Sequence, residues 1–418
     1  MKVSYLFSAS ALLLASATLA QSPEQVAEAA LEAAPVFDGH NDVPIQLRGR
    51  WRNVIGDFDF VDTTDTGPEH AERRTMHTDL NRLREGKVGA QFWSVYVSAA
   101  LEEPEAIQAT LEQIDVTKRL VARYPEDLAL ATTADEVEAA LADDKIASLL
   151  GIEGGYSIGS SLGVLRQMHE LGVRYMTLTH STTLSWADSA TDDPVHGGLT
   201  EFGENVVREM NRLGMLVDLS HVSEGTMSDA LDIATAPVIF SHSGARAVNG
   251  HARNVPDTIL RRLPQNGGVV MVVGLPGYLS EDARRWYSLR QAEEARLATL
   301  WQGQPERVEA GLAMWEGSNP EPKATISDMA DHIDHIREIA GIDHIGIGGD
   351  YDGMDTGPVG MEDVSGYPGL FVELARRGYS QEDLEKITMR NVLRAMRGAE
   401  ATAAAQSGIP PIETPVPD

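Results

Sequence analysis

Eight short apolar runs, rich in β-branched residues, alternate with stretches of helical pattern along most of the chain, and this alternation limits the fold most strongly. The strands that we expect span residues 36–42, 88–97, 146–155, 173–180, 214–221, 237–242, 267–274 and 344–350. Helical patterns between them include residues 104–124, 162–171 and 201–213. Strands that alternate with helices form βαβ units and a parallel sheet. Because the sequence has no Gly-rich dinucleotide fingerprint, we expect a TIM-like (β/α)8 barrel and not a doubly wound sheet.

Polar side chains occur where these apolar runs end. The first run carries His40 and Asp42 in the segment VFDGHNDVP, and in an extended chain these two side chains point the same way. Five later runs end in Glu153, His180, His221, His242 and Asp350. The carboxyl ends of the strands of a parallel barrel converge on one face. Polar groups that converge in this way need a common ligand, so the pattern predicts a metal site on that face.

The ligand types narrow the choice of metal. The sequence contains no cysteine, so thiolate ligands are excluded, and His, Asp and Glu suit Zn²⁺, Mn²⁺ or Co²⁺ in a hydrolytic site. The residues suffice for two ions that share one carboxylate. We assign His40, Asp42 and Glu153 to one ion, and His221, His242 and the same Glu153 to the other. Two ions about 3.5–4 Å apart with a bridging hydroxide are a known arrangement for attack on a carbonyl group.

Charge and the first residues indicate where the protein works. The formal charge of −29 and the pI near 4.7 argue against nucleic acid and anionic membranes as partners. Residues 1–20 combine Lys2 with the apolar run LFSASALLLASATLA, which is typical of a secretory signal peptide cut near Ala20–Gln21. An uncleaved anchor or a buried N-terminal helix is the alternative. We expect a periplasmic or secreted protein whose mature chain has no membrane anchor.

We expect one catalytic barrel domain over residues 21–400. Residues 279–325 form a charged stretch of helical periodicity between the last two expected strands, and in a barrel this loop opens on the active-site face. A lid, a wall of the substrate site, an oligomer contact as in a homodimer, and a solvated helix pair are all open interpretations of this insertion. Residues 401–418 are rich in proline and polar residues, which predicts a flexible tail.

Seven motifs resemble the membrane (renal) dipeptidase family of binuclear zinc metallopeptidases, peptidase family M19, and they occur in that family's order. They are DGHNDVP, GIEGG, YMTLTH, WADSA, LVDLSH, PVIFSHSGARAVNGHARNVPD and GIGGDYDG. The resemblance runs from about residue 36 to residue 397 and indicates a bacterial-type secreted member. It implies a TIM-like barrel with two Zn²⁺ ions that hydrolyses dipeptides, including those with a C-terminal D-residue, through a metal-bridging hydroxide.

The resemblance also implies a role for each site residue. His40 and Asp42 match the ligands of one zinc ion, Glu153 matches the bridging carboxylate, and His221 and His242 match the ligands of the second ion. The relatives in animals connect the last two strands by a segment shorter than residues 279–325, which leaves substrate preference open.

Three further residues match the substrate site of that family. His180 matches a histidine that polarises the scissile carbonyl or holds the oxyanion. Arg253, in HARN, matches the arginine that binds the substrate's carboxylate, a task that suits its bidentate fork. Asp350 matches the aspartate near the substrate's amine, which can protonate the leaving nitrogen. A dipeptide would thus be held at both ends, which disfavours longer peptides.

Other residues permit two interpretations each. Asp38 either orients His40 or is an ordinary turn residue. Of Trp93 and Tyr96, one could line the pocket, although aromatic residues on a strand are more often core. His332 and His335 have helical spacing but lie on an amphipathic pattern, where packed or solvated histidines are sufficient.

Two alternative functions compete with a dipeptidase. A related amidohydrolase-type barrel would act on a cyclic amide or deaminate a base, but it usually carries H-x-H at the first strand or a carboxylated lysine. This chain has H-x-D there and Glu153 at the third expected strand. A non-catalytic metal-containing binding protein would be expected to lack His180, Arg253 or Asp350, and all three are present.

Overall fold

The computed structural model describes residues 21–64 and 75–415, so the expected signal peptide lies outside the described residues. Eight parallel strands form a closed barrel in which β2 pairs with both β1 and β4, and β1 pairs with β9. The strands are β1 Val36–Asn41, β2 Val88–Tyr96, β4 Ile146–Glu153, β5 Val173–Thr177, β6 Leu216–Asp218, β7 Ile239–Phe240, β8 Val269–Val273 and β9 Ile345–Gly348. All eight lie within the runs expected from the sequence, and the TIM-like prediction is confirmed.

One short strand was not expected. β3 (Leu128–Leu130) pairs with residues 146–148 of β4, and β5 pairs with β4 from residue 150 onward. Its three residues are too few to give a periodic pattern. β6 and β7 are shorter than their apolar runs, because the polar residues that follow belong to loops on the carboxyl face.

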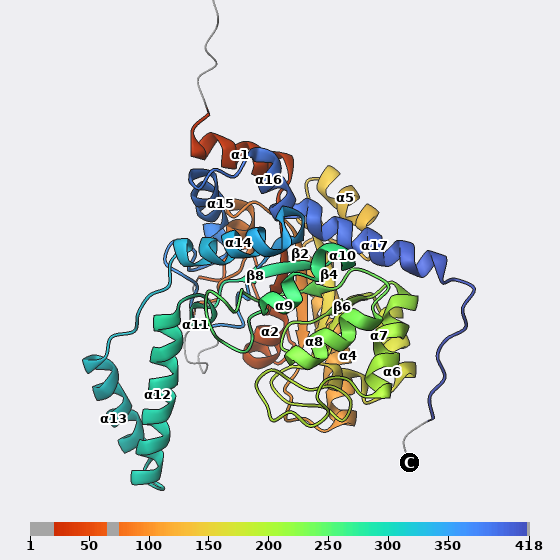
Figure 1. Cartoon of the computed structure of the whole chain (residues 1–418). Coiled ribbons are helices and arrows are strands. Elements are labelled where there is room, and N and C mark those ends of the chain that lie inside the picture. The colour runs from red at the N-terminus through yellow and green to blue at the C-terminus, as the bar shows by residue number, and fades with distance from the viewer. Residues whose placement is uncertain (1–20, 65–74, 416–418) are drawn as a thin grey trace, which may run out of the picture.

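Helices surround the barrel (Figure 1). They are α1 Pro23–Ala33, α2 Val43–Trp51, α3 Leu80–Glu85, α4 Glu103–Arg123, α5 Ala134–Ala142, α6 Leu162–Glu170, α7 Glu201–Leu213, α8 Glu224–Ile233, α9 Asp257–Leu260, α10 Leu263–Asn266, α11 Pro276–Leu279, α12 Glu281–Leu300, α13 Pro305–Ser318, α14 Ile326–Ala340, α15 Tyr367–Arg376, α16 Gln381–Glu385 and α17 Asn391–Ala405. Short 3₁₀ or π turns occur at η1 Gly155–Ile158, η2 Ile342–His344, η3 Val364–Gly366 and η4 Lys386–Arg390. The three helices that we expected between strands, now α4, α6 and α7, match within one residue at each end.

Aromatic rings from three strands stack inside the barrel. Phe92 lies between Phe37 and Tyr175, with ring centroids 5.4 and 4.8 Å away. Tyr175 fits only because its neighbour on β4 is Gly151, where an added Cβ would lie 2.0 Å from the tyrosine ring. The stack fills the barrel with apolar volume and carries the Tyr175 hydroxyl to the level of the strand ends.

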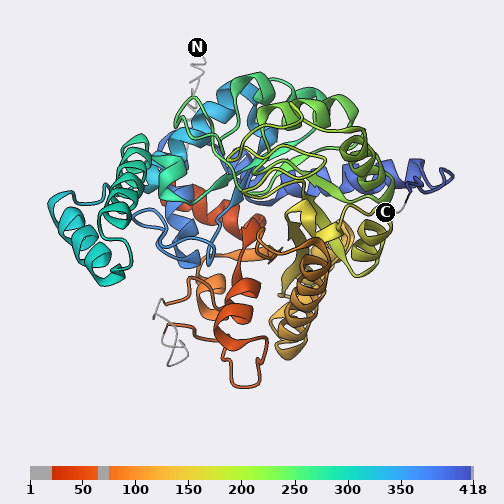
Figure 2. The same ribbon diagram turned by 90° about the horizontal axis from the view of Figure 1, so that it is seen from below.

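The long segment between β8 and β9 forms two helices that project from the barrel. Figures 1 and 2 show α12 and α13 side by side and away from the main body. The pair contributes little to the core, since its buried apolar residues are Ala283, Leu297 and Leu312. α14 then returns to the barrel.

The C-terminal segment differs from the expected flexible tail. α17 runs to Ala405, past the boundary expected at residue 401. Farther on, the backbone N–H of Ile412 donates to Glu209, and its carbonyl accepts from Arg166. The polar tail is thus tied to α6 and α7 by hydrogen bonds, which composition alone does not predict. No helix among the described residues is long and apolar enough to cross a membrane.

Candidate active site

The first two site residues lie where β1 passes into α2. His40 is buried in β1, and Asp42 is not part of the strand but the residue that precedes α2. The turn nevertheless brings the side chains together, with Nε2 of His40 3.3 Å from Oδ2 of Asp42. The two side chains thus lie close together as alternation predicted, although the chain is no longer extended at Asp42.

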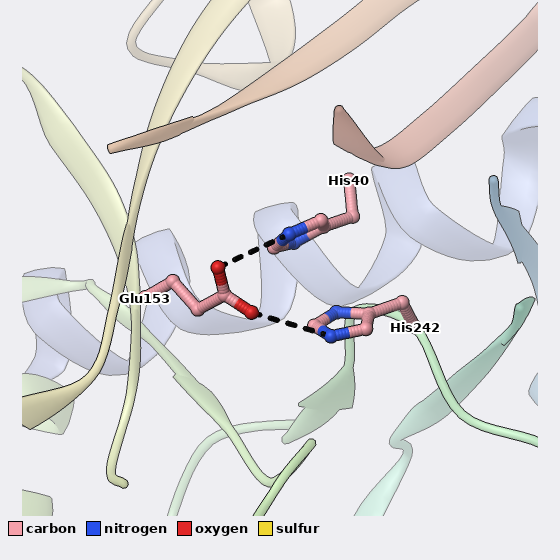
Figure 3. Close-up of side chains that lie close together, drawn as sticks. All are labelled: His40, Glu153 and His242. Atoms are coloured by element: carbon pink, nitrogen blue, oxygen red, sulfur yellow. Dashed lines mark ion pairs between the residues drawn. The ribbon is translucent and has the colours of Figure 1, made fainter. Parts of the chain in front are cut away.

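Glu153 is the last residue of β4 and lies at the centre of the cluster. Its Oε2 is 3.5 Å from Nε2 of His40, and its Oε1 is 3.0 and 3.4 Å from Nε2 of His221 and His242. Figure 3 shows His40 and His242 next to each other, with each ring facing a different oxygen of the Glu153 carboxylate. Ser94 also donates to Oε2 at 3.2 Å. One carboxylate therefore faces three imidazole nitrogens, that of His40 with one oxygen and those of His221 and His242 with the other.

His221 and His242 follow β6 and β7 on neighbouring loops. Their Nε2 atoms are 2.9 Å apart. His221 has φ 68°, a left-handed conformation that is uncommon for a residue with a side chain and that recurs at functional sites. The tight turn directs its ring to Glu153.

The charge states of His221, His242 and Glu153 suit metal binding. Burial lowers the pKa of His221 and His242 well below the usual range, and nearby positive groups lower it further, so both rings are neutral with free lone pairs. Burial opposes ionisation of Glu153, but the surrounding histidines hold its pKa well below the usual range. Neutral imidazoles beside an ionised carboxylate are the protonation states that metal ligands require. Burial opposes a charge on His40, but Tyr175, Glu153 and Asp42 raise the pKa of His40 well above the usual range, so a metal ion bound there would have to displace a proton.

Several buried ligand atoms in the cluster have no hydrogen-bond partner. They are Nε2 of His40, Oδ1 of Asp42 and Nδ1 of His221. Buried polar atoms are normally paired, so the unpaired Nε2 of His40, which lies near Asp42 and Glu153, indicates a ligand at that place. The ligand atoms form three overlapping groups, each within 4.8 Å: His40, Glu153 and His242; Glu153, His180 and His221; and His40, Asp42 and Asp350. With nitrogen and oxygen donors only, these residues fit a divalent metal centre.

A cavity of about 300 Å³ opens above the cluster. His180 contributes a side chain that is 20% exposed, and its ring lies 4.2 Å from that of His221 and 4.9 Å from that of Tyr96. Tyr96 thus lines the cavity, whereas Trp93 is fully buried in the core. The pocket interpretation therefore holds for Tyr96 and the core interpretation for Trp93.

Arg253 and Asp350 line the same cavity. Arg253 is 1% exposed, and its guanidinium lies 5.4 Å from the ring centroid of Tyr278. The Nε atom of Arg253 has no partner, although its Nη atoms make long contacts with Ser243 and the His242 carbonyl. A buried arginine without a carboxylate partner requires an anion from elsewhere.

Asp350 follows β9 in a left-handed conformation, with φ 63°. Burial raises its pKa well above the usual range, and the carboxylates of Asp42 and Glu153 add to the effect. Gly353 makes this approach possible, because a Cβ there would lie 2.1 Å from Oδ2 of Asp42 and 2.6 Å from Oδ1 of Asp350. The carboxyl group of Asp350 is thus held beside the cluster in an environment that favours its protonated form.

The structure therefore brings every predicted metal and substrate residue into one place. The sequence profile described as membrane dipeptidase (peptidase family M19) matches residues 24–409, which is most of the chain. The chain belongs to the membrane dipeptidase family.

Curated relatives and solved structures agree with this membership. Dipeptidase 3 of Rattus norvegicus is 41% identical over 389 residues, which cover 92% of this chain and 69% of the rat protein. Dipeptidase 3 of Homo sapiens is 40% identical over 396 residues, covering 94% of this chain and 70% of the human protein. As a member of the family, the chain is a metallodipeptidase, a hydrolase that acts on dipeptides.

Two solved structures share the fold. The probable dipeptidase PvdM from Pseudomonas aeruginosa superposes with a TM-score of 0.76 at 24% identity, covering 91% of this chain and 99% of PvdM. A metallo peptidase from Rhodobacter sphaeroides, liganded with a phosphinate mimic of the dipeptide L-Ala-D-Ala, gives a TM-score of 0.70 at 24% identity. That match covers 88% of this chain and 99% of the other.

Sequence reasoning missed the residues that hold the rings of His40 and His242 in place. The hydroxyl of Tyr175 is 2.9 Å from Nδ1 of His40. Oγ of Ser241 is 2.8 Å from Nδ1 of His242 and donates to Oδ2 of Asp218 at 2.6 Å. Tyr175 and Asp218 stand inside the motifs YMTLTH and LVDLSH, so their polar groups within apolar runs were a usable signal.

Asp38 is more than a turn residue. Its carboxylate accepts from the backbone N–H of His40 at 3.1 Å and of Gly349 at 2.8 Å, and from the hydroxyl of Tyr367 at 2.7 Å. It therefore fixes the backbone at the ends of β1 and β9 and orients His40 through the main chain, not through the ring.

His332 is a packed structural residue. Its Nδ1 accepts from the backbone N–H of Ala245 at 2.8 Å, and Nε2 donates to the carbonyl of Leu279 at 3.0 Å. It thereby joins the loop that carries Arg253 to the end of α11, which carries Tyr278. His335 is 2.8 Å from Asp257 and lies outside the cavity.

Proposed function

We propose that this membrane dipeptidase binds two zinc ions and hydrolyses dipeptides, including those with a D-residue at the carboxyl end. The arrangement around Glu153 is the observation that carries the proposal. Oε2 faces His40, which is in contact with Asp42, and Oε1 faces His221 and His242. This division supports one ion on each side of a bridging Glu153.

The ions would supply a water molecule of lowered pKa as the nucleophile and would stabilise negative charge on the carbonyl oxygen. The residues of the chain perform the remaining tasks. Arg253 binds the substrate's carboxylate, because its buried guanidinium lines the cavity and its Nε–H has no hydrogen-bond partner within the protein. His180, the most exposed histidine of the cluster, is placed to donate a hydrogen bond to the carbonyl oxygen.

Asp350 acts on the amine side. Its carboxyl group lines the cavity beside Asp42, and an ionised carboxylate there can take the proton released by the attacking water and pass it to the leaving nitrogen. The carbon–nitrogen bond then breaks with a neutral amine as leaving group. Arg253 and Asp350 both line the cavity of about 300 Å³, so the two ends of a short substrate can be recognised in one space.

The test compares peptides that differ by one residue. Protein spanning residues 21–418, loaded with Zn²⁺, is assayed with Ala-Ala, Ala-D-Ala and Ala-Ala-Ala, with and without a chelator. We expect metal-dependent cleavage of the dipeptides and at least a tenfold lower kcat/KM for the tripeptide. Equal cleavage of dipeptide and tripeptide would remove the proposal that both ends of the substrate are recognised.

We also propose that residues 1–20 are a signal peptide that directs export and is removed by cleavage near Ala20–Gln21. The composition of these residues supports the proposal. Mass spectrometry of the native protein would show a chain that begins at Gln21. A native chain that retains Met1 and stays in the cytoplasm would contradict export.

A further inference from the structure

A second cavity, of about 500 Å³, adjoins the catalytic cavity. Both are lined by Leu275, Tyr278 and Gly353, so the two spaces share a wall. The far wall of this outer cavity is α12, the first helix of the projecting pair. The inserted segment therefore shapes a space beside the reacting groups and is not only a solvated helix pair.

The apolar part of the outer cavity lies next to the shared wall. Leu275, Pro276, Met354 and the rings of Tyr278 and Tyr287 line it. Tyr287 is seated closely, because a Cβ at Gly277 would lie 3.1 Å from its ring. Such a surface favours an aliphatic or aromatic group over a small or charged one.

The charged residues of α12 at this cavity already have partners. Arg284 makes two hydrogen bonds to Glu281, at 2.7 and 2.6 Å. Arg290 is 2.6 Å from Glu316 and 3.4 Å from Glu294. These cations are therefore less available to attract an acidic side chain, so shape and apolar contact decide what enters.

The geometry also indicates which end of the substrate meets the outer cavity. The guanidinium of Arg253 lies 5.4 Å from the ring centroid of Tyr278, and the ring centroids of Tyr278 and His251 are 4.4 Å apart. Of the two cavities, His251 lines only the outer one. Gly353, which both cavities share, packs against the carboxylates of Asp42 and Asp350. The series of rings that starts at Arg253 is therefore the observation that assigns the outer cavity to the carboxylate side of the substrate.

We propose that the outer cavity is a specificity subsite that accepts a large apolar or aromatic side chain of the substrate's C-terminal residue, with α12 as its wall. This inference rests on the proposed dipeptidase function and on the role of Arg253 in it. A dipeptide with a bulky second residue would bury apolar area there that a glycine or alanine would not.

The experiment fills the cavity from α12. Gln291 lines the outer cavity and is exposed, so Gln291→Trp adds a large ring there without disturbing the core. The neighbouring Ala292 is equally exposed but does not line the cavity, so Ala292→Trp is the matched control. Zinc-loaded parent and variants are assayed with Ala-Ala, Ala-Phe and Phe-Ala.

We expect Gln291→Trp to lower kcat/KM for Ala-Phe by about tenfold relative to Ala-Ala, the scale of discrimination that an apolar pocket provides. Phe-Ala should be unaffected, and Ala292→Trp should leave all ratios at the parent values. An unchanged Ala-Phe to Ala-Ala ratio in Gln291→Trp would overturn the subsite, and a selective loss of Phe-Ala would overturn its assignment to the C-terminal residue.

Two further controls keep the result interpretable. If Gln291→Trp does not fold, Ser288→Trp fills the same cavity from one helical turn earlier. Cleavage of Ala-Ala by the parent tests the proposed function on its own. If the parent cleaves Ala-Ala but neither Gln291→Trp nor Ser288→Trp changes the Ala-Phe to Ala-Ala ratio, only the subsite is refuted.

Discussion

The hydroxyl of Tyr175 lies 2.9 Å from Nδ1 of His40 and thereby fixes the ring whose Nε2 faces Asp42 and Glu153. When Nδ1–H donates to the tyrosine oxygen, the lone pair of Nε2 is free for a metal ion. Partners of this kind set the tautomer and orientation of metal-binding histidines. Tyr175 is fully buried inside the barrel, so the core of the fold and the metal centre meet at this hydrogen bond.

Replacing Tyr175 by Phe should therefore weaken metal binding while the fold remains. We expect the apparent affinity for Zn²⁺ to fall by about tenfold, the usual effect of losing such a partner. Chelator competition measures it. Tyr379→Phe is the control, because it removes a tyrosine hydrogen bond to Asp334 far from the site. Equal affinities in both variants would show that the Tyr175 hydroxyl does not position His40.

Ser241 should play the same part for His242. Its hydroxyl lies between Oδ2 of Asp218 and Nδ1 of His242, so Ser241→Ala leaves the ring without its partner. Metal analysis after dialysis should show loss of the ion on the His242 side at zinc concentrations that saturate the parent, with affinity lower by about tenfold. Ser365→Ala, which removes a hydroxyl bonded to Asp363, serves as the control. Full retention of metal by Ser241→Ala would contradict this role.

Arg253→Ala should raise KM and leave the metal content unchanged. Removal of one partner of a buried charge pair costs about 2–5 kcal/mol, which corresponds to roughly 30-fold to more than 1,000-fold in kcat/KM. The effect should be specific to the free carboxylate. Ala-Ala amide, which lacks that charge, should be a poor substrate of the parent and should lose little in the variant. A similar loss for the acid and the amide would assign Arg253 a purely structural role.

His332 makes stability depend on pH. Burial lowers the pKa of His332 to about 4, below its ordinary value of 6.5. The unfolded chain therefore binds a proton at this residue between these pH values and the folded chain does not, so the stabilisation is complete above pH 6.5 and is lost as pH falls toward 4. The shift amounts to about 3 kcal/mol.

The measurement compares parent and His332→Gln by denaturant unfolding between pH 7.5 and pH 4.5. The free energy of unfolding of the parent should fall more steeply with acid than that of the variant. Taking the difference between the two proteins at each pH cancels effects that they share, including loss of metal. Parallel curves would show that His332 does not titrate as its burial predicts.

The sequence revealed the barrel because its strands are short apolar runs that alternate with helical patterns, and most of these runs have a polar end. The same pattern indicated Glu153, His180, His221 and His242, which the structure brings together. β3 was missed because three residues carry no periodicity. α17 continues to Ala405 through a segment rich in alanine, past the start of the tail expected at residue 401.

Contacts between distant strands could not be predicted in the same way. Tyr175 and His40 are 135 positions apart, and their hydrogen bond depends on how the barrel closes around Phe92 and Gly151. The helical insertion and its place on the active-site face could be predicted from its periodicity and its position between the last two strands. Which residues of α12 line a cavity depends on how α12 packs against α11. Local pattern predicts elements, whereas the supporting hydrogen bonds come from the closed barrel.

The most direct test of the account is the zinc content and activity of Glu153→Gln. Because the carboxylate faces both groups of histidines, its loss should affect both ions together. We predict that the parent holds two zinc ions per chain and cleaves Ala-Ala. Glu153→Gln should hold at most one ion, with kcat/KM lower by about a thousandfold or more. A variant that retains two ions and parental activity would contradict the central claim that Glu153 bridges the metal centre.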